Sequence, residues 1–212
     1  RYVAFKVDDK SIMVFGAPGS DQMSEKVMTH INQQFPMKKI NTVYITHHHN
    51  DHGAGIRPYV AEGAALVAHE TAVDFYRTQI NRPKSSVVID ALDREFKKGS
   101  TTVIGVASND AYTIEDTNRP VVVYPVLNGH VEDMVIILVG NKNFLYAGDL
   151  YVSGIARDKR SGTKRGPNVV PYHSAISLNE TIMKFNIPRG PLLGSHDKEA
   201  VSYQDLIDYI TD

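Results

Sequence analysis

The hydrophobic and polar positions of this chain alternate between two periods. Short apolar runs recur along its length, and several of them are continuous, which is typical of strands covered on both faces. Glycine, proline and polar clusters separate the runs, as expected for turns and loops. The pattern predicts strands at residues 2–7, 11–15, 42–45, 65–68, 87–89, 101–106, 121–126, 135–139, 144–147 and 192–193.

Between these strands the period changes to that of a helix. Met23, Val27 and Ile31 repeat every four residues and Pro36 follows, which predicts an amphipathic helix that ends before the proline. A second helical stretch is expected near residues 56–62. Three further helix starts are predicted by polar pairs at the spacing of a capping box, namely Thr71 with Asp74, Ser177 with Glu180, and Ser202 with Asp205.

The predicted strands and helices form two successive groups, about residues 1–118 and 119–212, without a linker-like boundary. We therefore expect an α/β chain with one domain of two helix-covered sheets. The polar segment 108–120 is the expected crossing between the halves, and residues 154–171 form a second long polar stretch. Because Arg1 opens directly on a strand-like pattern, we expect the chain to have been cut from a longer protein.

Composition excludes several classes of protein. With 23 Lys and Arg against 24 Asp and Glu, the net charge is −1, so no global field attracts nucleic acid or an anionic membrane. The longest apolar run, about residues 134–139, is far shorter than the roughly 18 residues of a membrane span. We therefore expect a water-soluble chain without a membrane partner, and its compartment, periplasmic or secreted or else cytoplasmic, stays open.

The absence of cysteine narrows the possible chemistry further. It excludes disulfide scaffolds, thiol nucleophiles and thiolate metal sites, and it leaves histidine and carboxylate as the strong ligands. Three of the histidines have ordinary contexts and are expected to be surface or core residues: His30, His48 and His69. An alternative role for His69 is to act as the hydrogen-bond partner of a metal-bound imidazole and so orient that ligand.

Four of the nine histidines lie within six residues, in the segment Thr46-His47-His48-His49-Asn50-Asp51-His52-Gly53 that follows a predicted strand. Along an extended chain His47 and His49 lie on one side and His48 on the other. Asp51 and His52 come after the turn and can present an oxygen and a nitrogen to a second point nearby. This arrangement is typical of a two-metal site, in which the ions lie about 3.5–4 Å apart.

A pair of metal ions needs more ligands than this segment provides. Candidates stand at the ends of three other predicted strands: His130 in Asn128-Gly129-His130, Asp149 in Gly148-Asp149, and His196 in Gly194-Ser195-His196. A carboxylate has two oxygens and can bridge two cations, so Asp149 is the natural shared ligand.

The order His-x-His-x-Asp-His, then Gly-His, then Gly-Asp, then a last His resembles the metallo-β-lactamase superfamily of hydrolases over nearly all of the 212 residues. The resemblance implies a four-layer αβ/βα sandwich of two mixed β-sheets covered by helices, with the site at one sheet edge. It also implies a ligand set: His47, His49 and His130 for one metal ion, Asp51, His52 and His196 for the other, and Asp149 for both.

The chain also departs from parts of that superfamily. The cysteine of one zinc-dependent lactamase subgroup is absent, and Asp149 at the bridging position instead resembles glyoxalase II, lactonase and phosphodiesterase members, so antibiotic hydrolysis is not the expected activity. The flavin-dependent diiron members have Glu where His49 stands, which argues against oxygen reduction. Asp197 follows His196 where glycine is common, so the backbone beside the second metal is expected to differ.

The ligand set predicts a dinuclear metal-dependent hydrolase. Two divalent ions, expected to be zinc with iron or manganese as alternatives, would lower the pKa of a shared water from about 15.7 towards 7. The metal-bridging hydroxide would attack a small ester, thioester, lactone, amide or phosphodiester, and Asp51 would orient the water and carry its proton. Tyr151 and His173 are candidate substrate contacts, for which a packing role and a capping role are the respective alternatives.

Two other functions stay open. The five cations between Arg157 and Arg165 could bind phosphates in a nucleic-acid phosphodiesterase of the same fold. The sequence lacks the interleaved aromatic and basic residues that stack bases, however, so nucleic acid is not the expected partner and a solvated loop is favoured. The other alternative is a non-catalytic metal-binding or sensor module. A small-molecule substrate is the expected partner, and the sequence makes no prediction of oligomeric state.

Overall fold

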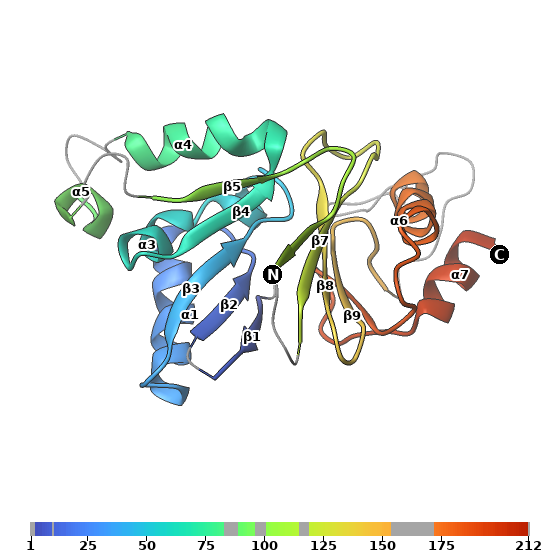
Figure 1. The fold of residues 1–212 in the computed structure, drawn as a ribbon, viewed down its shortest axis with the longest axis horizontal. Coiled ribbons are helices and arrows are strands. Elements are labelled where there is room, and N and C mark those ends of the chain that lie inside the picture. Colours follow the sequence, from blue (N-terminus) through green and yellow to red (C-terminus); the bar gives the residue numbers. More distant parts are fainter. Residues whose placement is uncertain are drawn as a thin grey trace. The chain divides into compact units, whose positions relative to one another are not determined.

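A computed structural model of the chain describes residues 3–9, 11–82, 89–95, 101–114, 119–153 and 172–211. They belong to two compact units, Val3–Gly105 and Val106–Asp212. Each unit is built on one five-stranded mixed sheet (Figure 1). The candidate ligands are divided between the units, so each unit carries one part of the predicted site.

The first unit holds a sheet with the strand order β1-β2-β3-β4-β5. β1 and β2 are antiparallel, whereas β2, β3 and β4 run parallel. The strands are β1 (Ala4–Val7), β2 (Ser11–Phe15), β3 (Lys39–Tyr44), β4 (Ala65–His69) and β5 (Val103–Val106). The helices are α1 (Asp21–Gln34), α2 (Asn50–Gly53), α3 (Ile56–Ala61), the 3₁₀ turn η1 (Glu70–Ala72), α4 (Val73–Asn81) and α5 (Ala91–Glu95).

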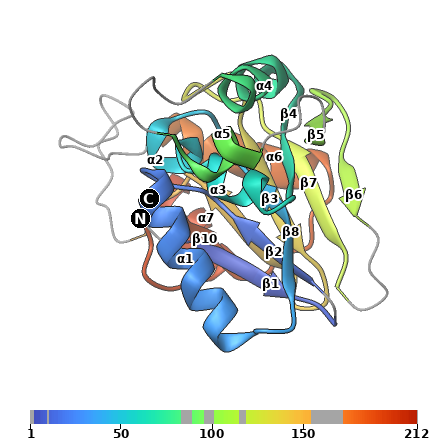
Figure 2. The same cartoon turned by 90° about the vertical axis from the view of Figure 1, so that its left-hand side faces the viewer.

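One face of this sheet is covered by helices, with α1 and α3 in front of the strands in Figure 2. Ile12 and Val14 of β2 lie in a core cluster with Ile31 of α1 and Tyr59 of α3. The apolar residue between the two β2 positions, Met13, belongs to the other face and is also buried. Burial on both faces explains why the strands read as continuous apolar runs.

The second unit holds a sheet with the strand order β10-β9-β8-β7-β6, in which β6 to β9 are antiparallel and β9 and β10 are parallel. Its core joins Ile136 and Leu145 of the sheet to Leu178 and Leu206 of the two helices. The elements are β6 (Tyr112–Ile114), β7 (Val121–Pro125), β8 (Val135–Val139), β9 (Phe144–Gly148), α6 (Tyr172–Lys184), β10 (Leu192–Gly194) and α7 (Tyr203–Thr211).

These elements confirm an α/β chain with two mixed sheets flanked by helices. The predicted strands at residues 11–15 and 135–139 are found with the predicted bounds. The chain passes from the first sheet to the second between Val106 and Tyr112. The single-domain arrangement, with halves of about residues 1–118 and 119–212, stays a prediction.

Two of the three predicted helix starts are wrong. Thr71 lies inside η1, where the His69 imidazole accepts a hydrogen bond from the Thr71 N–H at 3.3 Å, and α4 begins at Val73. Ser177 lies inside α6, which begins at Tyr172. The third start is confirmed, because Ser202 N–H donates to Asp205 Oδ2 at 2.8 Å and Asp205 N–H donates to Ser202 Oγ at 3.3 Å.

Some sequence predictions fall on residues outside the described ranges. These are residue 2 of the predicted strand 2–7, residues 87 and 88 of the predicted strand 87–89, residues 115–118 of the predicted crossing 108–120, the polar stretch 154–171 and the basic segment from Arg157 to Arg165. In the part of the chain that is described, none of the helices is long and apolar enough to cross a membrane.

Candidate metal centre

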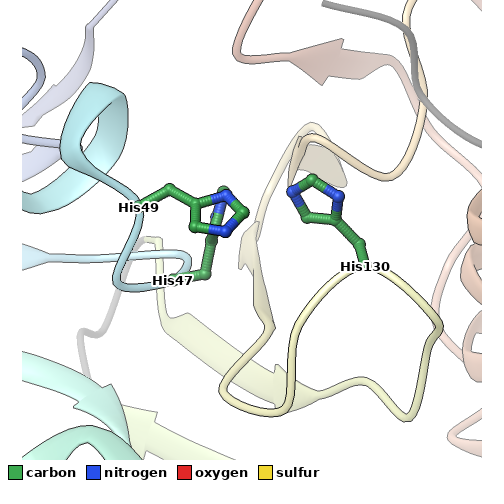
Figure 3. Close-up of side chains that lie close together, drawn as sticks. All are labelled: His47, His49 and His130. Atoms are coloured by element: carbon green, nitrogen blue, oxygen red, sulfur yellow. The ribbon is translucent and has the colours of Figure 1, made fainter.

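The histidine-rich segment of the first unit follows directly on β3. His47 Nε2 and His49 Nδ1 lie 3.1 Å apart, and Figure 3 shows their two imidazoles side by side at the junction of β3 and α2. His47 is buried, whereas His48 between them is exposed. The predicted alternation of these three residues is therefore confirmed.

Helix α2 turns the chain back so that two more candidate ligands reach the same place. The N–H groups of His52 and Gly53 both donate to the His49 carbonyl at 2.9 Å. The His52 ring lies against His47 with centroids 4.0 Å apart, and Asp51 Oδ2 is 3.3 Å from His52 Nε2. His47, His49, Asp51 and His52 thus gather in one small volume, which we call the first half-site.

This tight turn requires a small residue at position 53. A Cβ added to Gly53 would lie 2.8 Å from the Tyr76 hydroxyl and 3.2 Å from a methyl group of Ile45. Because both neighbours are buried, neither can easily give way. The glycine after His52 is therefore part of what holds α2 against the core.

The second unit carries a second group of candidate ligands around Asp149, which follows β9. Asp149 Oδ1 is 3.0 Å from His196 Nε2, and Asp149 Oδ2 is 3.7 Å from His130 Nε2. Each carboxylate oxygen thus faces a different imidazole. His130, Asp149 and His196 form the second half-site, and the two-sided carboxylate is what a shared ligand requires.

Parallel pairing of β9 and β10 explains why Asp149 and His196 meet. Gly148 pairs with Gly194, and the Ser195 N–H donates to the Gly148 carbonyl at 2.8 Å. Gly148 has φ of 59°, the left-handed region that glycine adopts without strain. The chain can therefore turn sharply at the strand end and present Asp149 towards His196.

His130 stands on the loop after β7 (Figure 3), and Asn128 closes that loop. The Asn128 Oδ1 accepts hydrogen bonds from the N–H groups of His130 at 2.7 Å and Val131 at 3.1 Å. Its Nδ2 donates to the carbonyls of Val126 at 2.8 Å and Val131 at 3.2 Å. One side chain thus fixes the backbone that carries His130.

Asp197 fixes the backbone next to His196. This buried carboxylate accepts hydrogen bonds at Oδ1 from the Ser153 N–H and hydroxyl, both at 2.9 Å, and at Oδ2 from the Gly194 N–H at 3.1 Å. A Cβ on Gly194 would lie 2.2 Å from the Tyr151 carbonyl, so the two strand ends approach closely. The residue that departs from the family pattern therefore ties the ends of β9 and β10 together.

Neither Asn128 nor Asp197 was among the residues predicted to serve the site. Asn128 precedes Gly129, and asparagine before glycine is a turn signal that could have drawn attention to it. Nothing in the sequence indicates which atoms Asp197 binds, because its partners come from Ser153 and Gly194.

The two predicted substrate contacts have other partners in the structure. The Tyr151 hydroxyl donates to the Asp205 carbonyl at 3.1 Å, and burial raises the pKa of Tyr151 to about 12. This hydrogen bond connects the segment after β9 to α7. His173 lies exposed in the first turn of α6, with its ring 5.9 Å from that of Tyr172. A substrate role for either residue stays a prediction.

The donor sets fit divalent metal ions. Zinc binds histidine nitrogen at about 2.0–2.1 Å, so two nitrogens on one tetrahedral zinc lie about 3.3 Å apart. The 3.1 Å between His47 Nε2 and His49 Nδ1 is close to this spacing. Imidazole nitrogen and carboxylate oxygen suit zinc, iron and manganese alike, and these residues qualify as ligands that could hold metal.

The family model for the metallo-beta-lactamase superfamily matches residues 24–207 of the chain, which therefore belongs to that superfamily. This range includes both half-sites. None of the curated proteins compared with the chain is significantly similar to it.

Solved structures show the same fold at low sequence identity. A metallo-beta-lactamase from Pontibacter korlensis has a TM-score of 0.65 at 13% identity, covering 98% of this chain and 91% of that one. The DIM-1 metallo-beta-lactamase has a TM-score of 0.66 at 14% identity, covering 97% and 83%. TMB-1 has a TM-score of 0.63 at 16% identity, covering 97% and 81%. The chain thus has the metallo-beta-lactamase fold.

Proposed function

We propose that the two half-sites together bind two divalent metal ions, zinc in the first place, and that the chain is a metal-dependent hydrolase. The ligands of one ion are His47, His49 and His130, and those of the other are Asp51, His52 and His196, with Asp149 shared between them. The superfamily model supports this arrangement because its match includes all seven residues.

The observation that carries the proposal is the spacing of donor atoms within each half-site. His47 Nε2 and His49 Nδ1 lie 3.1 Å apart, close to the spacing of two nitrogens on one zinc ion. Asp149 directs Oδ1 at His196 and Oδ2 at His130, so its two oxygens are committed to two different ligand partners. A carboxylate that joins two ions needs this division.

Bound divalent ions would supply a water ionised at neutral pH and would stabilise negative charge on the substrate. Asp51 is the residue of this chain that can take up the proton of that water. Its Oδ2 is 3.3 Å from His52 Nε2, and its side chain is 35% exposed, so the carboxylate lies within the half-site and still reaches solvent. Substrates of this chemistry are small esters, thioesters, lactones, amides or phosphodiesters.

The first experiment measures metal content and turnover together. Protein purified without added metal and then loaded with zinc is expected to hold two equivalents by elemental analysis. It is then assayed on a panel of an ester, a thioester, a lactone and a phosphodiester. No hydrolysis of any member by protein with two bound ions would contradict the hydrolase assignment, and fewer than one equivalent would contradict the metal centre.

Asp51→Ala tests the role of the acid. Removing a positioned acid or base costs about 10²–10⁴-fold in turnover, so kcat should fall by that factor. Asp74→Ala is the matched control, because the Asp74 side chain is 96% exposed and forms a long ion pair with Arg77 at 3.5 Å. Turnover by Asp51→Ala equal to that of Asp74→Ala would show that Asp51 does not serve the reaction.

A further inference from the structure

The loop between β7 and β8 holds the one asparagine of this sequence that is followed by glycine. Asn128 precedes Gly129, whereas each of the other asparagines precedes a residue with a side chain. A backbone nitrogen can attack the side-chain amide carbon of the asparagine before it, and a side chain on the attacking residue hinders that approach. Because glycine lacks this hindrance, Asn128 is the asparagine best suited to the reaction.

The structure shows no packing reason for a glycine at position 129. A Cβ added to Gly129 would have no atom within 4 Å, and the residue is not in the left-handed region. By contrast, a Cβ on Gly190 or Gly194 would lie 2.1 or 2.2 Å from a backbone oxygen. Gly129 is exposed, and its N–H has no hydrogen-bond partner among the described residues. Its nitrogen is therefore open to water and not held by another group.

Two backbone N–H groups polarise the side-chain carbonyl that the Gly129 nitrogen would attack. Asn128 Oδ1 accepts hydrogen bonds from the N–H groups of His130 at 2.7 Å and Val131 at 3.1 Å. An oxyanion hole has the same form, with donors about 2.7–3.1 Å from the oxygen that becomes negative. Attack on Asn128 Cγ would place the negative charge on this Oδ1. The loop therefore stabilises the intermediate of ring closure.

Other hydrogen bonds of the same amide oppose the reaction. Asn128 Nδ2 donates to the carbonyls of Val126 at 2.8 Å and Val131 at 3.2 Å, and both bonds are lost when this nitrogen leaves. They join neutral groups, whereas the two bonds at Oδ1 become charge-assisted in the intermediate. Charge-assisted hydrogen bonds are roughly twice as strong as neutral ones, so the balance favours ring closure.

We propose that Asn128 is a site of spontaneous modification through a cyclic succinimide formed with Gly129. The Gly129 nitrogen bonds to Asn128 Cγ and gives its proton to water. The Cγ–Nδ2 bond breaks, and Nδ2 takes up a proton from water and leaves as ammonia. One water molecule is then consumed in opening the ring. Opening at Cγ gives aspartate, and opening at the backbone carbonyl gives isoaspartate.

Either product changes the loop that carries His130 (Figure 3). Aspartate lacks the two hydrogen bonds that Nδ2 donates to Val126 and Val131. Isoaspartate also lengthens the main chain by one atom, two positions before His130. The reaction needs no oxidant, enzyme or metal ion, so the inference goes beyond the proposed function and does not rest on it.

The first test incubates the folded full chain in neutral buffer and follows each asparagine-containing peptide by mass spectrometry. Asn128 is expected to convert about tenfold or more faster than Asn141, an exposed asparagine followed by Lys142 in the turn between β8 and β9. Gly129→Ala fits the space and keeps the side-chain partners of Asn128, and it should slow the conversion by about tenfold or more. Equal rates at Asn128 and Asn141, or in the wild-type and Gly129→Ala, would overturn the proposal.

The products distinguish ring closure from direct hydrolysis of the amide. Direct hydrolysis gives only aspartate, whereas the succinimide gives aspartate and isoaspartate together. A protease that cleaves before aspartate and not before isoaspartate separates the two, and the Asn128→Asp variant is the standard for the first. Both products are expected at position 128, and aspartate alone would refute the cyclic route.

A comparison with the unfolded chain tests the contribution of the loop. In guanidinium chloride the Asn-Gly sequence remains, but the His130 and Val131 N–H groups no longer bond Asn128 Oδ1. Removal of one oxyanion donor typically costs about 10²–10³-fold in rate, so the folded chain should convert at least as fast as the unfolded one. A slower conversion in the folded chain would show that the loop protects Asn128 and would overturn the inference.

Discussion

The side-chain oxygen of Asn128 lies 2.7 Å from the backbone nitrogen of His130 and accepts its hydrogen bond. The same amide group also bonds the Val126 carbonyl and both backbone groups of Val131. Among the candidate ligands, His130 is separated by the most residues from the nearest helix or strand. The Asn128 side chain therefore determines how the loop presents the His130 imidazole.

Asn128→Ala should weaken metal binding. Residues that hold a metal ligand in place without binding the metal typically contribute 10–100-fold in metal affinity, so zinc affinity should fall by about that factor. The variant also leaves backbone donors without their partner, which costs about 1–3 kcal/mol for each buried group. Competition with a chromophoric chelator measures the first effect, and urea unfolding of the zinc-free protein measures the second.

Asn128→Asp is the control for this turn. It keeps the oxygen that accepts from His130 and Val131 and loses the two hydrogen bonds donated by Nδ2. Its zinc affinity should lie between those of the wild-type and Asn128→Ala. An alanine variant with wild-type affinity would show that the loop holds His130 without Asn128.

The parts of the site that sequence predicts are those that depend on local geometry. His47 and His49 face the same way because side chains alternate along an extended chain, and this needs no knowledge of the rest of the fold. The placement of His130, Asp149 and His196 after strands was predicted from where three apolar runs stop, which is also a local feature of the sequence. Sequence could not pair Asp149 with His196, since their 3.0 Å contact depends on β9 lying beside β10.

The helix boundaries show where local pattern fails. Ser202 with Asp205 forms a true capping box, whereas Ser177 with Glu180 has the same spacing in the interior of α6. Serine occurs both at helix N-caps and inside helices, so the spacing alone does not mark a helix boundary. The short elements α2, α5 and β6 were missed because each is too short to show a hydrophobic period.

The largest loss of stability is predicted for the removal of Arg57. The importance of this residue is not visible in the sequence, because its partners follow more than 20 residues later. Its guanidinium bonds both oxygens of Asp90, at 2.6 and 3.0 Å, and Asp93 at 2.6 Å. It also donates to the Gln79 carbonyl at 2.7 Å and the Arg82 carbonyl at 2.9 Å, at the end of α4. Arg57 thus connects α3, α4 and α5.

Arg57→Ala should lower the free energy of unfolding by about 3–5 kcal/mol, because it leaves two partly buried carboxylates without their cation. Urea unfolding monitored by circular dichroism measures this. The control is Arg77→Ala, whose side chain is 58% exposed and lies 3.5 Å from Asp74, and which should change stability by about 0–1 kcal/mol. Equal losses in the two variants would contradict a special role for Arg57.

Asp197→Ala should disturb the second half-site more than the first. The substitution leaves the Ser153 and Gly194 N–H groups without their carboxylate partner, at a cost of about 1–3 kcal/mol each. Because His196 is adjacent, one of the two expected zinc equivalents should bind about 10–100-fold more weakly while the other is retained. Elemental analysis after dialysis against a weak chelator distinguishes the two.

Asp208→Ala is the matched control for Asp197→Ala. Asp208 lies exposed on α7, in the same unit, and accepts a hydrogen bond from the Gln204 side chain at 2.7 Å. It should keep both zinc equivalents. Loss of both equivalents from Asp197→Ala would instead indicate a general collapse of the unit, which its far-ultraviolet circular dichroism would reveal.

Tyr146 predicts how stability depends on alkaline pH. Burial raises its pKa to about 12, and the Ser195 hydroxyl donates to its oxygen at 3.1 Å. The unfolded chain ionises this phenol near pH 10 while the folded chain keeps the proton, so the contribution of Tyr146 is complete below about pH 10 and is lost as the pH rises to about 12. In this window the free energy of unfolding should fall by about 1.4 kcal/mol per pH unit for this group.

Urea unfolding of the wild-type and Tyr146→Phe between pH 8 and 12, roughly two units either side of the usual tyrosine value, measures the difference. The stability advantage of the wild-type should shrink with pH by that slope, and a difference that does not vary with pH would show that the folded chain ionises Tyr146 as readily as the unfolded one.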